Sequence, residues 1–156
     1  MKYPRNNLVL FSEDASGVLS NKCTEVTVFD SKLEEFTRYM FDVAKQHKGI
    51  GLSAPQVGIS KQIFVIIIGH YEEVFINPSF SPTNKNSKNK IISTEGCLSF
   101  GDTFKSIKRW DEIKVSYKSL KNKPMSLVLS DLASVCFQHE FDHLQGVHFG
   151  STTAAK

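Results

Sequence analysis

The spacing of hydrophobic residues predicts a first amphipathic helix over about residues 31–47. Within this segment apolar side chains recur every three or four positions, at Leu33, Phe36, Met40, Val43 and Ala44. This spacing gathers them on one face of a helix. Ser31 and Glu34 have the spacing of a capping box at the helix start, and Gly49 is expected to end it.

A second helix is predicted from about Ser130 to Gln145, with Gly146 as its stop signal. Its apolar positions continue, at the same helical spacing, into two histidines: the series is Leu132, Val135, Cys136, His139 and His143. A buried helix face that leads into two imidazoles is the most informative feature of the sequence, because buried imidazoles need polar partners or a metal ion.

Alternating and β-branched segments predict short antiparallel strands elsewhere in the chain. The expected strands cover about residues 62–68, 73–77, 91–94, 112–120 and 125–129. Gly69 and His70 are expected to form a hairpin turn, and the polar stretch 81–90 an exposed loop. We therefore predict an α+β fold in which short antiparallel β-sheets pack around a central helix, as one domain over residues 1–156.

Composition narrows the class of protein. A chain of 156 residues with 40% hydrophobic and 22% charged residues is an ordinary globular domain. Its formal charge of +3 does not indicate binding to specific DNA, and its longest apolar run, Ile63–Ile68, is too short to span a membrane. Three cysteines without paired spacing and the absence of a targeting segment favour a cytoplasmic location.

The predicted second helix carries an H-E-x-x-H motif, His139 to His143. At about 100° per residue, His143 lies about 40° from His139, so both imidazoles share a face with Glu140. Two such imidazoles can bind one metal ion, and the carboxylate can act as a general base. Asp142 falls outside this face and is expected to be structural. The alternative is a pair of histidines on an ordinary amphipathic helix with a surface Glu between them.

A catalytic metal usually takes three protein ligands. Zincin-like metallopeptidases, the alternative class of enzyme, take the third from downstream, but only thirteen residues follow His143, and Phe149 stands where a metzincin has its last histidine. An upstream ligand is therefore expected. Cys97, in Glu95–Ser99, is the best candidate, although an ordinary buried cysteine is an equal alternative. A structural metal module would need a fourth ligand, such as His47 or His148.

Three segments together resemble the peptide deformylase family. They are GIGLSAPQ at residues 49–56, EGCLS at 95–99 and HEFDH at 139–143, in the order typical of that family. The resemblance extends to residues 75–78, to Gln138 and to Leu144 and Gly146, and so covers nearly the whole chain. It implies an enzyme that removes the formyl group from the N-terminal formylmethionine of newly made polypeptides.

The resemblance also implies the roles of individual residues. The metal ligands would be Cys97, His139 and His143. A metal-bound water, deprotonated by Glu140, would attack the formyl carbon, and Glu140 would then protonate the leaving amine. The side chain of Gln56 and the backbone N–H of Leu98 would stabilise the oxyanion. The methionine side chain would be bound by Ile50, Gly51, Leu132, Val135 and Cys136.

Cofactor and partners follow from the same resemblance. It implies one divalent metal ion per chain, with ferrous iron as the physiological choice, and the donor set also suits zinc, nickel or cobalt. The partners implied are N-formylmethionyl nascent peptides and, transiently, the ribosome; no membrane or specific DNA is expected, and the chain is expected to be a monomer. Residues 85–123 hold ten basic and four acidic residues, either an aid in approaching RNA or a solvated face.

The chain departs from the family pattern at several positions. Ser53 replaces an alanine of the first motif. The family usually continues after the second motif with a proline and soon an arginine; residues 100–105 differ here, although Lys105 could serve in part, and Arg109 falls where the family often has arginine. A helix that bacterial members carry after the third motif is not expected, and in this the chain resembles short, phage-encoded members.

Overall fold

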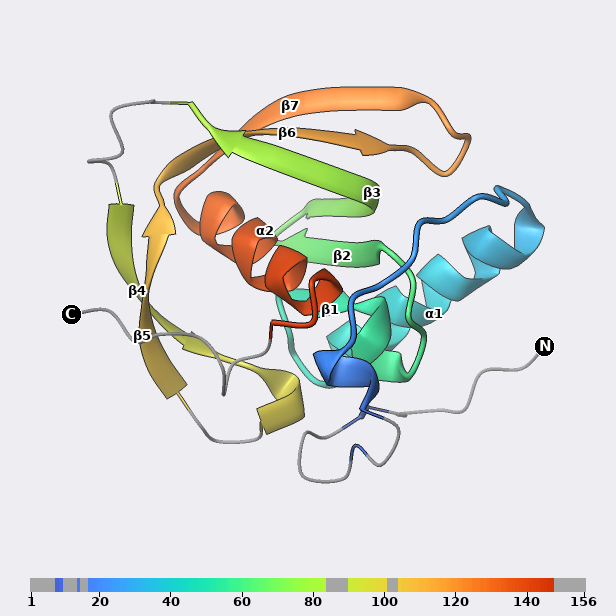
Figure 1. The fold of residues 1–156 in the computed structure, drawn as a ribbon, viewed down its shortest axis with the longest axis horizontal. Helices are drawn as coiled ribbons and strands as arrows, with labels where there is room; N and C mark the ends of the chain where they lie inside the picture. Colours follow the sequence, from blue (N-terminus) through green and yellow to red (C-terminus); the bar gives the residue numbers. More distant parts are fainter. Residues whose placement is uncertain (1–7, 10–13, 15–16, 84–89, 101–103, 148–156) are drawn as a thin grey trace.

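The structure, a computed structural model, describes residues 8–9, 14, 17–83, 90–100 and 104–147 (Figure 1). Two α-helices occur in these ranges, α1 (Ser31–Gln46) and α2 (Asp131–Leu144). The strands are β1 (Gly51–Ser53), β2 (Ile63–Ile68), β3 (Tyr71–Pro82), β4 (Lys90–Gly96), β5 (Phe104–Trp110), β6 (Glu112–Lys118) and β7 (Pro124–Ser130). Short 3-10 helices are η2 (Val18–Ser20), η3 (Ala54–Val57) and η4 (Leu98–Phe100). The predicted α+β class is confirmed.

The strands form two antiparallel sheets. Five of them pair in the order β1-β2-β3-β6-β7, and β4 pairs with β5 in a separate two-stranded sheet. Helix α1 packs on β1 and β2, whereas α2 contacts β1, β2, β6 and β7 and also β5 of the second sheet. Helix α2 therefore lies between the two sheets, and the second sheet can present residues to it from the side opposite the core (Figure 1).

Strand β2 is buried on both faces, which explains its unbroken apolar sequence. Alternate side chains of a strand point to opposite faces. Ile63 and Val65 join the core beneath α1, whereas Phe64 and Ile66 join the core beneath α2. A strand covered by a helix on each side needs hydrophobic residues at every position.

Phe137 is at the centre of the core beneath α2. Its ring is fully buried and lies 4.9 Å from that of Phe64 and 5.2 Å from that of Phe75, both edge-on. Phe80 packs against the same ring at 5.7 Å, also edge-on. Because aromatic edges and faces attract one another, this cluster fixes the rotation of α2 about its axis and with it the direction of its polar face.

Local corrections to the predicted elements have clear physical reasons. The N-cap of α1 is Asp30, whose carboxylate accepts a hydrogen bond from Leu33 N at 3.1 Å, so the expected capping box from Ser31 is wrong. Glu34 instead forms an ion pair with Lys121 at 2.7 Å. Leu132 was expected on the buried face of α2, but it is 52% exposed because the first turn of the helix borders a cavity.

The strand boundaries also differ from the prediction. β3 extends to Pro82, into the expected loop, whose central residues 84–89 lie outside the described part of the chain. β1 and β5 were not predicted.

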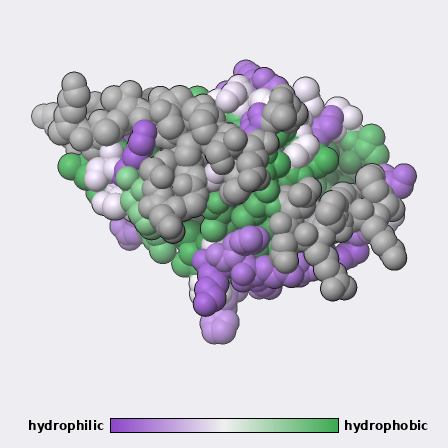
Figure 2. All heavy atoms as spheres, turned by 90° about the horizontal axis from the view of Figure 1, so that it is seen from below, coloured by the Kyte–Doolittle hydropathy of each residue, from purple (hydrophilic) through white to green (hydrophobic). Residues whose placement is uncertain are grey.

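Figure 2, seen from below the view of Figure 1, shows hydrophobic residues gathered in the middle of one face and hydrophilic residues along its margins. Neither helix in the described ranges is long and apolar enough to cross a membrane.

Candidate metal centre

The structure brings together the three residues expected to bind a metal. Cys97 follows the end of β4, and His139 and His143 lie one turn apart on α2. One potential ligand atom from each residue lies within 4.8 Å of the others, and Cys97 Sγ is 3.4 Å from His143 Nε2. Cys97 and His143 are buried, at 6% and 1% exposed. A thiol and two imidazoles at this separation form a donor set that suits zinc, iron, nickel or cobalt.

The surroundings of His139 favour a positive charge at this point. Burial opposes the charged imidazole, but hydrogen bonds to Cys97 and Glu95 and the charge of Glu140 outweigh it and raise the pKa of His139 to about 10. The acidic groups around His139 therefore favour a positive charge at this imidazole. This electrostatic preference, together with the donor set, fits a bound metal ion.

Glu95 holds His139 in place. Its Oε1 atom accepts a hydrogen bond from His139 Nδ1 at 2.9 Å, and both its oxygens accept hydrogen bonds from Arg109 at 2.9 Å. Burial would raise the pKa of Glu95, but the hydrogen bonds to His139 and Arg109 and the guanidinium charge lower it to about 2. The carboxylate is therefore ionised, and it fixes the orientation of the imidazole, as partners of metal-binding histidines commonly do.

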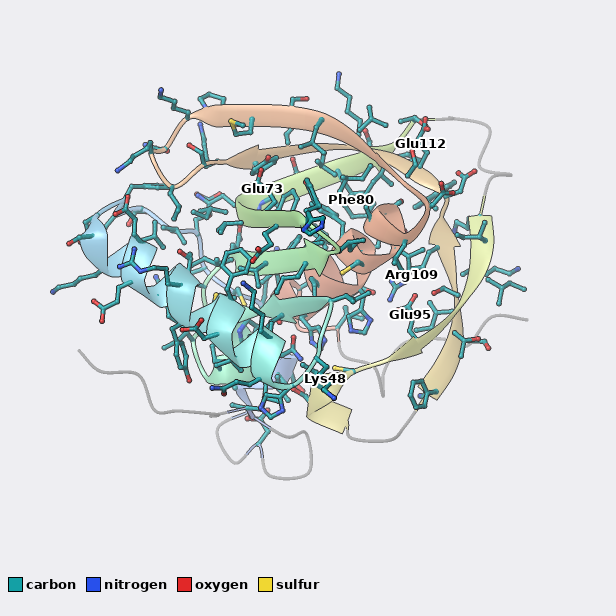
Figure 3. The ribbon with its side chains drawn as sticks, turned by 180° about the vertical axis from the view of Figure 1, so that it is seen from behind. Lys48, Glu73, Phe80, Glu95, Arg109 and Glu112 are labelled. Carbon is teal, nitrogen blue, oxygen red and sulfur yellow. The ribbon has the colours of Figure 1, made fainter. Side chains whose placement is uncertain are left out.

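Arg109 extends this network to the far side of the motif. Its Nη1 atom donates to Asp142 Oδ2 at 2.6 Å, while its other nitrogens bind Glu95. The guanidinium is 6% exposed, and it compensates two carboxylates that would otherwise be costly to bury. Figure 3 shows Glu95 and Arg109 reaching from the β4–β5 sheet towards α2. Asp142 thus has the structural role expected from its position on the helix.

Glu140 lies on the cavity side of α2 and is 3% exposed. Its Oε1 atom has no hydrogen-bond partner among the described residues. Burial raises the pKa of Glu140 to about 7, with the positive charges of His139 and Arg109 opposing the shift and the carboxylates of Glu95 and Asp142 adding to it. A carboxyl with a pKa near neutrality can both accept and return a proton, as a general acid–base catalyst must.

Gln56, on η3, directs its amide towards Cys97. Its Oε1 atom accepts hydrogen bonds from the backbone N–H and the hydroxyl of Ser53 at 3.0 and 3.1 Å. Its Nε2 atom is then left to donate to Cys97 Sγ at 3.7 Å and to Ser99 Oγ at 3.3 Å. Ser53, the departure from the family pattern, therefore helps to orient the amide instead of disturbing the loop.

A cavity of about 400 Å³ opens over these groups. All of the residues expected around the methionine side chain line it: Ile50, Gly51, Leu132, Val135 and Cys136. Burial, and to a lesser degree the charges of Glu140 and Glu95, raise the pKa of the Cys136 thiol well above its usual range. Cys136 therefore contributes an apolar wall. Gln56, Leu98, Cys97, His139 and Glu140 line the same cavity.

Several residues that line the cavity were not among the site residues predicted from the sequence. They are Lys48, Gly49, Ser93, Thr94, Glu95, Gly96 and Phe104. Glu95 stood in a recognised motif, but its contact with His139 depends on the packing of β4 beside α2. Ser93 and Thr94 had a strand pattern without any sign of a cavity, and Phe104 had no motif at all.

The ligand group in the described part of the chain contains three residues. His47, considered as a fourth ligand, is exposed at the C-terminal end of α1, and His148 lies outside the described residues. Three protein donors beside a lined cavity are typical of a catalytic metal site, whereas a structural site has four.

Comparisons with known proteins agree with this geometry. A sequence model of the polypeptide deformylase family matches residues 7–155. A peptide deformylase of Thermotoga petrophila is 40% identical over 130 residues, 83% of this chain and 77% of that protein. The crystal structure of the Thermotoga maritima peptide deformylase has a TM-score of 0.88 at 33% identity, covering 99% of both chains. That of a Synechococcus elongatus peptide deformylase in complex with actinonin has a TM-score of 0.87 at 33% identity, covering 100% of this chain and 82% of that one.

Proposed function

The chain belongs to the polypeptide deformylase family and has that family's activity, and we propose that Cys97, His139 and His143 hold the metal ion that this activity requires. Held by these three residues, a divalent cation would supply Lewis-acid chemistry, making water easier to deprotonate and polarising a carbonyl group. The remaining chemistry belongs to side chains of the cavity.

Glu140 is the proton carrier in this proposal. Its carboxylate takes a proton from the attacking water, whose oxygen bonds to the formyl carbon. The carbon–nitrogen bond then breaks, and Glu140 returns the proton to the leaving amine, giving formate and a free amino terminus. The pKa of about 7 supports both steps, because the group is close to equal populations of its two forms at neutral pH.

Gln56 and Leu98 stabilise the negative charge that develops on the formyl oxygen. The Gln56 Nε2 atom already points towards Cys97, so it can donate to an oxygen beside the metal site. The backbone N–H of Leu98 would be the second donor, since Leu98 directly follows Cys97 and lines the cavity. Donors that are fixed before the reaction stabilise the oxyanion without reorganising.

The substrate is an N-formylmethionyl nascent peptide. The methionine side chain packs against Val135 and Cys136, whose exposures of 7% and 4% make an inner apolar wall. Only the amino-terminal end of a peptide presents a formyl group, so the cavity acts on chain ends and not on internal bonds. A zincin-like peptidase is disfavoured because no third ligand from downstream of His143 takes part in the described ligand group.

Ferrous iron is the physiological metal in this proposal, and zinc, nickel and cobalt are alternatives that the donor set accepts. We place the enzyme in the cytoplasm as a monomer, with a transient contact to the ribosome. The three cysteines, all free thiols, support a reducing compartment. The excess of basic residues over 85–123 supports an approach to RNA.

The buried Glu140 carboxylate, placed beside the Cys97 and His139 ligands in an apolar cavity, carries this proposal. Its test is an anaerobic assay of formylmethionyl-peptide hydrolysis with metal analysis of the same sample. Activity that follows metal content and disappears in Glu140→Gln supports the proposal, and activity retained by that variant contradicts it.

A further inference from the structure

The cavity has an outer apolar region beyond the part that the methionine side chain fills. Its inner wall, Val135 and Cys136, is buried. Three other apolar side chains line the same cavity but stay exposed to solvent. Ile50 and Leu132, at 46% and 52%, border the part expected to hold the methionine side chain, and Phe104, at 67%, lies beyond it. Large apolar side chains left exposed at the mouth of a binding cavity are typical of surfaces that a ligand covers.

Phe104 is held at this mouth by its strand partner. It is the first residue of β5 and lies opposite Gly96, the last residue of β4. A Cβ atom at position 96 would lie only 2.7 Å from the Phe104 ring, so the ring rests directly on the Gly96 backbone. Any larger residue at 96 would displace it. The ring is therefore held against Gly96, the residue that directly precedes Cys97.

The cavity lining includes an exposed cation beside the uncharged Ser93 and Thr94. Lys48 lines the cavity at the C-terminal end of α1, close to η4 (Figure 3). The cavity's acidic residues, Glu95 and Glu140, are 7% and 3% exposed and already serve His139 and the reaction. A basic side chain of the peptide would therefore be repelled by Lys48, and the cavity lining has no exposed carboxylate with which it could pair. An apolar side chain would instead cover hydrophobic surface.

We propose that Phe104 sets a preference for the residue that follows formylmethionine, binding apolar and aromatic side chains against its ring. This inference rests on the proposed function, because the formyl group at the metal site determines which peptide residues reach the mouth. The methionine side chain fills the inner region, and the next side chain along the peptide covers the exposed ring. An aromatic side chain gains both buried area and ring–ring attraction.

The test compares two substrates, formyl-Met-Phe-Ala and formyl-Met-Ala-Ala, with the metal-loaded enzyme. The ratio of their kcat/KM values is expected to be about tenfold in favour of the first. Phe104→Ser should reduce this ratio to about twofold, mainly by lowering kcat/KM for formyl-Met-Phe-Ala. Phe104→Leu, which keeps an apolar side chain, should retain an intermediate ratio. Inhibition by the products Met-Phe-Ala and Met-Ala-Ala should show the same order.

Ile92→Ser is the matched control, since Ile92 is a 64% exposed apolar residue of β4 that does not line the cavity. It should keep the wild-type ratio. Equal kcat/KM for both peptides in the wild type, or an unchanged ratio in Phe104→Ser, would overturn the assignment while leaving the deformylase activity intact. Failure of the proposed function would be distinct, because the metal-loaded wild type would then hydrolyse neither peptide.

Discussion

Gly51 leaves the space that the Glu140 carboxylate occupies. A Cβ atom at position 51 would lie 2.6 Å from Glu140 Oε2 and 2.9 Å from Cys136 Sγ. Non-bonded atoms do not approach this closely. A side chain at position 51 would therefore clash with the Glu140 carboxylate in its observed position. The glycine in the first motif and the glutamate in the third are thus parts of one arrangement, although 89 positions separate them.

Gly51→Ala is expected to displace the carboxylate of Glu140 and to lower kcat by about a hundredfold, since loss of general acid–base catalysis costs about 10²–10⁴ in rate. The metal content should stay at the wild-type level, because Gly51 does not belong to the ligand group. Steady-state kinetics and metal analysis of the same preparation check both parts. Gly69→Ala is the control for backbone strain: Gly69 has a φ of 60°, which strains an alanine, but its added Cβ meets no atom within 4 Å, so the variant should lose some stability and keep its kcat. Wild-type kcat in Gly51→Ala would contradict the account.

Glu95→Gln should weaken metal binding about 10–100-fold, the usual cost of losing a partner that orients a metal-binding histidine. The amide removes the negative charge that faces His139 and Arg109 while keeping nearly the same shape. Competition with a chelator measures the affinity. Glu73→Gln offers a matched control, because Glu73 binds Tyr117 away from the metal centre. If Glu95→Gln and the wild type lose metal at the same chelator concentration, the orienting role assigned to Glu95 is wrong.

Gln56→Leu removes the amide that points towards Cys97. Since one oxyanion donor is typically worth about 10²–10³ in kcat, a loss of that size is expected, with KM changing far less. Ser53→Ala, which deletes one of the two hydrogen bonds that orient the Gln56 amide, should lower kcat by about fivefold. Kinetics at equal metal occupancy separate these effects from metal loss. A change confined to KM would show that Gln56 only binds substrate.

The helix that carries the site could be predicted from sequence because its signals are local. Helical spacing placed His139 and His143 on one face, and the predicted ends, Ser130 and Gln145, are the residues that flank α2 in the structure. The motif alone left Cys97 uncertain as third ligand. Its place depends on how β4 packs beside α2, a long-range relationship that spacing along the chain does not contain.

The failures of prediction have the same origin. β5 lies in a short, charged segment, and it becomes a strand by pairing with β4 over Lys90–Gly96. Leu132 had the spacing of a core residue, but the helix turn that carries it borders a cavity, which periodicity does not reveal. Phe104 was missed because a single exposed aromatic residue becomes informative only when its neighbours across the strand are known.

The most direct test of the account is the anaerobic hydrolysis of a formylmethionyl peptide by wild type and Glu140→Gln, each loaded with ferrous iron and analysed for metal. We expect one metal ion per chain in both proteins, release of formate by the wild type, and a loss of at least about a hundredfold in kcat for the variant. A variant that binds its metal and still releases formate at the wild-type rate would contradict the assignment of Glu140 as the proton carrier.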